Sequence, residues 1–356
     1  MPDVLTIDGS QGEGGGQILR TSLALAAVTG QAFRIRSIRA GRTKPGLAAQ
    51  HLTCVRAVAE ICAADVGGDE LGSQDLEFFP NTIRGGKYLF DIAAESASAG
   101  ATGLVFQSVL PALLFADAPS EITIRGGTHV QWAPHFHYLD LVFRPAARHL
   151  GARFELELAR AGWYPRGEGQ LVAKVSPAPH LTALDWTERP RKVPLTSRAL
   201  LSDLPAHIAE RENASAQARL RGFGYEARLV AEELASVGKG TLCFLHTAGD
   251  CWAGGATSFG ELKKRAEVVG DQTGKDMLRY LRTRAAVDRH LADQLAPYCA
   301  LARGRSSYTT SEITLHLTTV LKVIRTFLAA SCHLIGALGE PGTVHVDGIG
   351  YRPELA

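Results

Sequence analysis

The sequence lacks the features that usually identify membrane and secreted proteins. No apolar run in its 356 residues reaches the roughly 18 residues that a membrane-spanning helix needs. The first residues, Met1–Leu5, contain neither a basic segment nor an apolar stretch, so we expect no signal peptide. The six cysteines include no Cys-x-x-Cys pair, which argues against a zinc ribbon and a disulfide-rich scaffold. We therefore expect reduced thiols in a cytoplasmic protein, or in a nuclear one if the source is eukaryotic.

The chain also lacks a net charge that would identify a nucleic-acid-binding protein. Its 38 Lys and Arg residues exceed its 36 Asp and Glu residues by only two, so any anion-binding surface must be local. With 46% hydrophobic and 21% charged residues, the composition is typical of a globular protein and excludes a largely disordered one. The length predicts about two domains of ~100–200 residues each.

Acidic residues are missing over one long stretch. No Asp or Glu occurs from Gly14 to Ala59, a stretch that contains seven Lys and Arg residues. Three of these cations, Arg39, Arg42 and Lys44, lie in a loop with Gly and Pro before a predicted helix. This arrangement favours a phosphate-binding face, although a solvated basic surface would also account for it.

Strand and helix patterns alternate along the chain. Up to about residue 182 we predict strands at 4–8, 33–38, 76–79, 88–92, 121–125, 154–158 and 171–175, and helices at 17–28, 47–62, 101–114 (interrupted at Pro111) and 135–150. The repetition favours an α/β or α+β fold built from similar units. A cluster of prolines at 177–194 then indicates a boundary.

The residues after this boundary predict a small inserted domain that ends near residue 275. Its expected elements are helices at 206–220 and 262–269 and strands at 227–231 and 241–246. A helical stretch at 276–295 would lead back to the first domain. An apolar helix at 313–328 and a strand at 342–346 would complete the chain.

A strand, a glycine-rich turn and a helix follow one another at residues 8–20. Bare glycines allow backbone amides to approach an anion at a helix N-terminus. Gln17 stands where the dinucleotide-binding fingerprint needs glycine, and Glu261 follows Gly260 where a P-loop needs lysine. Glu13 would repel a bare phosphate but suits one that is bound with a divalent cation. A purely structural turn explains the glycines equally well.

Histidines provide two further candidates. His129, His135 and His137 share one segment, but no Cys, Asp or Glu accompanies them at metal-ligand spacing, so the sequence does not favour a metal site there. His316 begins an apolar helix, where a neutral imidazole could act as a nucleophile, although a core histidine is the simpler interpretation of the pattern alone. His333, next to Cys332, is more simply a buried or loop histidine.

Taken together, these motifs resemble those of the RNA 3′-terminal phosphate cyclase family. The resemblance spans nearly the whole chain and is carried by residues 8–20, 38–46, 50–53, 106–112, 162–169, 264–267, 291–294, His316 with Thr319, and 347–350. It implies an α+β fold with a large domain of three repeated βαβαββ-type units, each similar to the C-terminal domain of translation initiation factor 3. A smaller α+β domain would be inserted at residues 183–275, between the two parts of the large domain at 1–182 and 276–356.

The resemblance also implies an activity, the ATP-dependent conversion of an RNA 3′-phosphate end to a 2′,3′-cyclic phosphate. His316 would attack the α-phosphorus of ATP and form covalent histidine-AMP and pyrophosphate. The AMP would then pass to the RNA 3′-phosphate, and the neighbouring 2′-hydroxyl would expel it. A reactive phosphoramidate divides one difficult displacement into easier steps, and the last step is intramolecular.

Carried over residue by residue, the resemblance implies a nucleotide site and an RNA-end site. Glu13 would hold Mg²⁺ or Mn²⁺, and Arg42 and Lys44 would contact the RNA end. The residues expected to bind ATP are Glu13, Gln17, Arg20, Arg39, Gln50, Gln107, Pro134, His290, Asp293 and Gln294. Among these, Arg20, Arg39 and Gln50 would hold phosphates, whereas Asp293 and Gln294 would contact the adenosine.

Two residues depart from the family pattern, and two alternatives stay open. The family often has tyrosine at the position of His290 and asparagine at that of Val320. Non-catalytic ribosome-assembly factors have the same fold but lack the nucleophilic histidine, so His316 and Arg20 favour the enzyme. An enolpyruvyl-transferase-like enzyme would need neither His316 nor the glycine–glutamate turn. The expected partners are ATP and RNA with a 3′-phosphate end, with no membrane, and a homodimer is left open.

Overall fold

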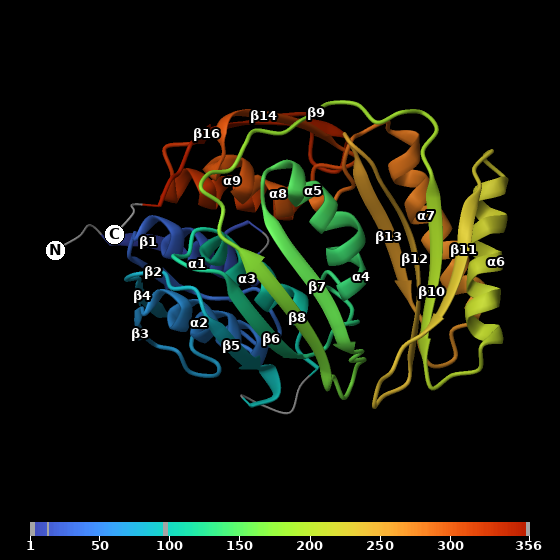
Figure 1. Cartoon of the computed structure of the whole chain (residues 1–356), viewed down its shortest axis with the longest axis horizontal. Coiled ribbons are helices and arrows are strands. Elements are labelled where there is room, and N and C mark those ends of the chain that lie inside the picture. Colours follow the sequence, from blue (N-terminus) through green and yellow to red (C-terminus); the bar gives the residue numbers. More distant parts are fainter. Residues whose placement is uncertain (1–3, 13, 95–98, 354–356) are drawn as a thin grey trace.

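The computed structural model describes residues 4–12, 14–94 and 99–353. These residues build four sheets of four strands each, with helices packed between and beside them (Figure 1). Every sheet combines parallel and antiparallel strand pairs, so the predicted α+β class is confirmed. Within the described ranges, no helix is both long and apolar enough to cross a membrane.

The first sheet is formed by the N-terminal residues and has the strand order β1-β2-β4-β3. Its elements are β1 (Leu5–Asp8), α1 (Gln17–Thr29), β2 (Phe33–Arg36), α2 (Ala49–Cys62), β3 (Asp65–Gly67) and β4 (Leu76–Phe79). A helix connects the parallel strands β1 and β2, as parallel pairing requires a crossover, and the other two pairs are antiparallel.

The second and third sheets repeat this pairing, with the orders β5-β6-β8-β7 and β9-β14-β16-β15. In each of them one parallel pair is followed by two antiparallel pairs. The second sheet and its helices are β5 (Lys87–Asp91), the 3₁₀ turn η1 (Ile92–Ala94), α3 (Thr102–Leu114), β6 (Ser120–Gly126), α4 (Phe136–Tyr138), the π-helical turn η2 (Leu139–Phe143), α5 (Arg144–His149), β7 (Arg153–Arg160) and β8 (Gly169–Ser176). The third comprises β9 (Asp185–Trp186), α8 (Leu291–Leu301), β14 (Arg303–Thr310), α9 (Leu315–Phe327), β15 (Ser331–Ile335) and β16 (Gly342–Ile349).

The fourth sheet, β11-β10-β12-β13, is formed by the residues between β9 and α8 and lies at one end of the molecule in Figure 1. Its elements are β10 (Leu195–Ser202), α6 (His207–Arg221), β11 (Ala227–Glu233), β12 (Gly240–Ala248), β13 (Ala253–Phe259) and α7 (Ala266–Arg282). Helices α6 and α7 pack against each other and against this sheet. The apolar core under them, which includes Val269, Met277 and Leu281, is separate from the main core.

Helix α1 lies at the centre of the remaining helices. Its Leu19, Leu23 and Leu25 are fully buried, and the helix is apolar on almost all sides, as expected for a helix covered all round. It packs against α2, α3 and α9, and α9 in turn packs against α8. Side chains from the first, second and third sheet units therefore meet along α1.

Three predicted elements differ from the structure. Helix α3 continues through Pro111 instead of breaking there. The predicted helix at 276–295 is wrong, because α7 ends at Arg282 and α8 begins at Leu291; between them Arg284 has a left-handed backbone, with φ of 53°. The helix predicted from 262 begins only at Ala266, because Lys263 has a φ of 67°.

The strands β3, β9, β13, β14 and β15 were not predicted, and β13 was missed because its sequence looks like a turn. β13 reads Ala-Gly-Gly-Ala-Thr-Ser-Phe, and glycine has low strand propensity. A Cβ at Gly254 would lie 2.6 Å from the Tyr280 ring, and one at Gly255 would lie 2.7 Å from the Phe244 ring. These glycines therefore allow close packing, which agrees with the absence of a P-loop at this position.

Candidate active site

The glycine-rich turn after β1 lies over the first turns of α9. Gly12 has a φ of +61°, and a Cβ there would lie only 2.2 Å from Oγ1 of Thr319. The side chain of Lys322 donates a hydrogen bond to Oε1 of Gln11, which also connects the turn to α9. Only glycine fits this conformation and this contact. The predicted metal ligand Glu13 lies outside the described residues.

His316 is the second residue of α9 and lies near its positive N-terminal end. Thr314 caps this end, since its Oγ1 accepts a hydrogen bond from the Leu317 amide at 3.1 Å. The His316 side chain is exposed, yet its pKa is lowered to about 4. Partial desolvation is the main cause of the lowered pKa, followed by electrostatic repulsion from Arg20, His290 and Arg42. At neutral pH the imidazole is therefore uncharged and keeps a lone pair.

A small hollow between α1, α3 and α8 brings together half of the residues that we expected to bind ATP. Helix α1 contributes Gln17, Arg20, Thr21 and Ala24, α3 contributes Gln107 and Pro111, and α8 contributes Asp293, Gln294, Pro297 and Tyr298. These helices belong to three different sheet units, so the hollow exists only in the folded chain.

Two prolines shape the walls of this hollow. Pro111 lies four residues after Gln107, and Pro297 lies four residues after Asp293, each inside its helix. Because proline has no N–H, it cannot hydrogen-bond the carbonyl four residues earlier. The carbonyl oxygens of Gln107 and Asp293 are therefore released from the helical ladder next to the hollow that both residues line.

The hollow combines the guanidinium of Arg20 with the carboxyl group of Asp293 and the side-chain amide of Gln294. Arg20 donates to Oε1 of Gln17 at 2.6 Å. Burial raises the pKa of Asp293 to about 7, against the opposing pull of Arg20, so its carboxyl can donate or accept a hydrogen bond near neutral pH. The buried Oε1 of Gln294 has no partner among the described residues. An unsatisfied buried acceptor favours a site completed by a ligand.

Hydrogen bonds within the predicted basic loop hold its conformation. Arg39 adopts a φ of 54°, and its Nη1 donates to the Gly46 carbonyl at 2.6 Å. The Gly46 amide donates to the Ile38 carbonyl at 2.8 Å. Arg42 and Lys44 are exposed on this loop. The charge of Arg42 lowers the pKa of His316, which places this cation beside the nucleophile candidate; no such effect is seen for Lys44.

His51 is a site residue to which the sequence assigned no role. It is 4% exposed, and a Cβ on Gly16 would lie 2.2 Å from its Nε2, so it touches the glycine turn. Burial lowers its pKa well below the usual value, and the charges of Arg20, Arg39 and Arg42 lower it further. The only signal in the sequence was its place directly after Gln50 in the acid-free stretch.

The other predicted ATP-binding residues that the structure describes do not line the hollow. Oε1 of Gln50 accepts from the Ala101 amide at 3.0 Å and so caps α3. The Pro134 carbonyl packs against Gly103 near the start of α3, where a Cβ would lie 2.2 Å away. His290 precedes α8, and its amide donates to Oδ1 of Asp288 at 2.7 Å.

Val320, the second departure from the family pattern, is fully buried in the main core below the first turn of α9.

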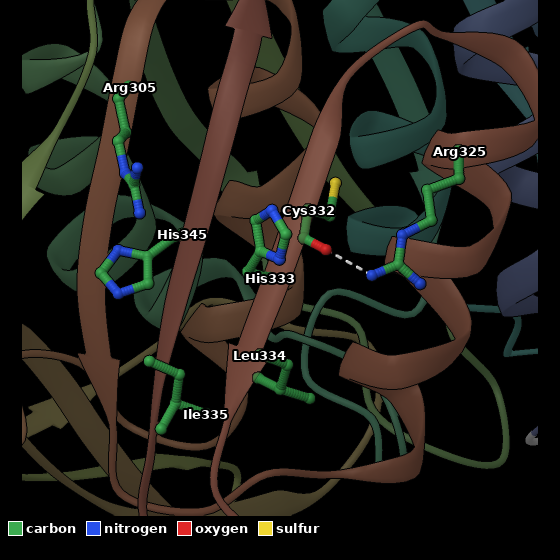
Figure 2. Close-up of a pocket in the computed structure, with 7 residues that line it drawn as sticks. All are labelled: Arg305, Arg325, Cys332, His333, Leu334, Ile335 and His345. Carbon is green, nitrogen blue, oxygen red and sulfur yellow. Dashed lines mark hydrogen bonds between the residues drawn. The ribbon is translucent and has the colours of Figure 1, made fainter.

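A larger hollow, of about 590 Å³, lies on the sheet of β14, β15 and β16 and contains His333 (Figure 2). His333 and His345 are directly paired on neighbouring strands, and Arg325 from α9 donates to the Cys332 carbonyl. Of the residues expected to bind ATP, none that the structure describes lines this hollow. Because His333 is an exposed strand residue without a helix N-terminus or glycine turn, its surroundings do not favour a nucleophile.

The family model and the curated relatives that match this chain share one description. A family model described as "RNA 3'-terminal phosphate cyclase" matches residues 11–334. A protein of that name from Methylococcus capsulatus is 45% identical over 349 residues, covering 97% of both chains. The protein of that name from Archaeoglobus fulgidus is 44% identical over 91% of this chain and 96% of its own. The one from Pyrobaculum aerophilum is 40% identical over 97% of this chain and 99% of its own.

Proposed function

Since the chain belongs to the RNA 3′-terminal phosphate cyclase family, we propose that it converts an RNA 3′-phosphate end to a 2′,3′-cyclic phosphate with ATP, and that His316 is its nucleophile. The observation that carries the residue assignment is the state of His316. Its imidazole is uncharged at neutral pH, accessible, and placed at a helix N-terminus beside Arg20 and Arg42. Relatives that lack the nucleophilic histidine would not have this combination.

In the first step His316 attacks the α-phosphorus of ATP. A nitrogen–phosphorus bond forms, the bond from the α-phosphorus to the bridging oxygen breaks, and pyrophosphate leaves. Arg20 and the amides at the start of α9 would stabilise the negative charge that develops on the phosphoryl oxygens. The low pKa of His316 means that no proton has to be removed from an imidazolium before the attack.

In the second and third steps the basic loop would hold the RNA end. An oxygen of the RNA 3′-phosphate attacks the phosphorus on His316, so the nitrogen–phosphorus bond breaks and an anhydride with AMP forms. The neighbouring 2′-hydroxyl then attacks the RNA phosphorus, loses its proton and expels AMP. Arg42 and Lys44 would fix the RNA phosphate, and this fixed geometry lowers the entropic cost of ring closure.

The nucleotide would occupy the hollow between α1, α3 and α8. Arg20 and Gln17 would bind the phosphates there. Arg39 on the basic loop and Gln50 on α2 would help to hold the phosphates. Asp293 and Gln294 would hydrogen-bond the adenosine, and the unpartnered Oε1 of Gln294 supports this assignment. Gln107, Pro134 and His290 would complete the walls.

A divalent cation, Mg²⁺ or Mn²⁺, would neutralise charge on the triphosphate, and we propose Glu13 as its ligand. The sequence supports this assignment, because a carboxylate within a glycine turn repels a bare phosphate but suits a phosphate–metal pair.

We also propose that the large domain consists of three βαβαββ units. The first three sheets share one strand order, and the elements of each follow one another as strand, helix, strand, helix, strand, strand. The inserted domain was predicted at residues 183–275. Because β9 pairs with β14 and α7 belongs to the smaller core, we place the insertion between β9 and α8.

The proposal is tested by incubating the protein with ATP labelled at the α-phosphate and a divalent cation, without RNA. Wild type and the matched variant His333→Ala should both acquire acid-labile, alkali-stable label, whereas folded His316→Ala should acquire none. A labelled His316→Ala would move the nucleophile elsewhere. An unlabelled, folded wild type would favour the non-catalytic assembly-factor alternative. Addition of 3′-phosphorylated RNA should then yield a 2′,3′-cyclic phosphate and AMP.

A further inference from the structure

Three histidines that the proposed reaction does not use converge at the junction between the second and fourth sheets. His129 and His135 lie in the segment between β6 and α4, and His137 lies in α4. They are 1%, 3% and 7% exposed, and one ring nitrogen of each lies within 4.8 Å of those of the other two. The helical turn after them packs against β12 and β13, whose sheet faces α4 in Figure 1.

Hydroxyl groups fix the orientation of two of the rings. Nδ1 of His129 is hydrogen-bonded to Oγ1 of Thr128 at 2.8 Å, and Nε2 of His135 is hydrogen-bonded to Oγ1 of Thr257 on β13 at 2.9 Å. Nδ1 of His135, the nitrogen left to bind a metal, accepts a longer hydrogen bond of 3.3 Å from the Tyr138 amide, and this amide also donates to the His135 carbonyl at 3.0 Å. Nε2 of His129 and Nδ1 of His137 face each other at 2.9 Å. Outer hydrogen bonds of this type hold ligating histidines in their rotamer and tautomer in metal sites.

All three imidazoles are uncharged at neutral pH, as metal ligands must be. Burial is the main cause that lowers the pKa of each histidine, and for His137 the pKa falls to about 3. The charge of His246 on β12 would lower the pKa of His135 and His137 further. The buried Nε2 of His246 finds no hydrogen-bond partner in the parts of the chain that the structure describes.

A cation also faces this group. The charge of Arg198 acts on both His137 and His246. However, Nη1 of Arg198 donates to Oε2 of Glu232 at 2.6 Å, so its charge is already paired. Sites with three neutral histidines do bind Zn²⁺, with water or another ligand in the fourth position.

We propose that His129, His135 and His137 bind one zinc-like transition-metal ion, with water in the fourth position. Zn–N bonds of about 2.0–2.1 Å in a tetrahedral site separate ligand nitrogens by about 3.3 Å, so the 2.9 Å contact between His129 and His137 needs to open only slightly. The proton between these two rings would leave their facing nitrogens, and Nδ1–H of His129 would then donate to Thr128. Imidazole ligands without carboxylates favour zinc over magnesium or calcium.

The position of this site suggests that the ion stabilises a junction. Tyr138, next to His137, donates to both carboxylate oxygens of Asp288 at 2.9 and 3.0 Å. The same carboxylate accepts from the amides of Gly255 on β13, His290 and Leu291. The metal would therefore join the fourth sheet to the start of α8, the helix that carries Asp293 and Gln294.

The test is Zn²⁺ titration of the chelator-treated full chain by calorimetry, together with the visible spectrum after loading with Co²⁺. We expect one ion per chain, a tetrahedral Co²⁺ spectrum and a zinc-dependent rise in Tm. His137→Gln should lose at least tenfold in affinity and the rise in Tm, whereas His207→Gln, which changes an exposed histidine on α6, should retain both.

A second variant keeps the test valid if His137→Gln does not fold. Thr257→Val removes only the outer hydrogen bond to His135 and should weaken Zn²⁺ binding about 10–100-fold. The proposal is overturned if the wild type binds no ion, or if its Zn²⁺ affinity is unchanged in folded His137→Gln. The readouts need no enzymatic activity, so failure here leaves the cyclase proposal untouched.

Discussion

His316 and the cluster of His129, His135 and His137 are uncharged at neutral pH mainly because of desolvation, but their surroundings differ. In the cluster the rings are buried, and other imidazoles and hydroxyls occupy their nitrogens. His316 is exposed, and two arginines lie near it at a helix N-terminus. A low pKa is therefore compatible with either metal binding or nucleophilic attack. Access to the ring and the charge of its neighbours separate the two functions.

The largest expected effect comes from removing the cation beside His316. Arg20→Gln should reduce the rate of histidine adenylation about 10²–10³-fold, since a buried cation at the phosphoryl group is lost. It should also raise the pKa of His316, because a nearby positive charge favours the neutral ring. The acid limb of the adenylation rate, measured from about pH 4 upward, should therefore move to higher pH.

The control for this variant is Arg34→Gln, which changes an exposed arginine paired with Glu77 at 2.8 Å. It should leave both the rate and the pH profile unchanged. An Arg20→Gln profile that coincides with that of the wild type would show that Arg20 does not act on the nucleophile.

The glycine turn provides the next comparison. In Gly12→Ala the added Cβ meets Thr319, and the residue must hold a left-handed backbone. Displacement of the turn from α9 should reduce adenylation about a hundredfold, because small errors in position are costly in catalysis. Zn²⁺ affinity should not change.

Gly238→Ala is the matched substitution for this comparison, because a Cβ there meets nothing within 4 Å and the backbone is not left-handed. Equal adenylation rates in the two variants would contradict the role that we assign to the turn.

The sequence predicted local structure well where a local signal determines it. The start of α1 at Gln17 and the end of α2 at Cys62 were predicted correctly, because apolar periodicity is a signal that acts over a few residues. It failed at Pro111, because α3 is buried on almost every side and this packing keeps the helix intact. It also failed at β13, where tertiary packing and not strand propensity selects the glycines.

Residue patterns alone could not have assembled the site. Gln107 and Asp293 line one hollow because α3 and α9 pack against α1 and α8 packs against α9, and no spacing in the sequence encodes this arrangement. The family resemblance supplied their grouping. For the histidine cluster, the sequence contained the three histidines, but Thr257 comes from another sheet, so the outer hydrogen bond was not visible.

A smaller effect is expected at the adenosine side of the hollow. The pKa of Asp293 is about 7 in the folded chain, above the ordinary value of 3.8, so the folded state binds more protons between these two pH values. Stability should therefore fall as pH rises from about 4 to 7. Asp293→Asn abolishes this loss and should gain about 2–3 kcal/mol relative to wild type between pH 5 and pH 7.

Urea unfolding of the nucleotide-free protein at several pH values measures this difference. Parallel stability curves for Asp293→Asn and wild type would rule out a buried carboxyl that titrates near neutral pH. The same variant should also bind ATP more weakly. An ionised carboxyl accepts hydrogen bonds at both oxygens and a protonated one donates from one of them, and an amide cannot replace both forms.

The smallest effect on adenylation should come from His137→Gln, and it tests whether the two histidine regions are independent. A hydrogen bond from Tyr138 to Asp288 connects the cluster to the start of α8, and His316 lies on a different helix. We therefore expect the Zn²⁺ affinity to fall at least tenfold while the adenylation rate at saturating ATP changes less than threefold. Both quantities are measured on one preparation, with and without zinc. A parallel loss of Zn²⁺ affinity and adenylation rate would mean that the ion acts on the nucleophile. A loss of Zn²⁺ affinity with an unchanged adenylation rate would show that the metal site and the nucleophile are independent, although both depend on neutral histidines.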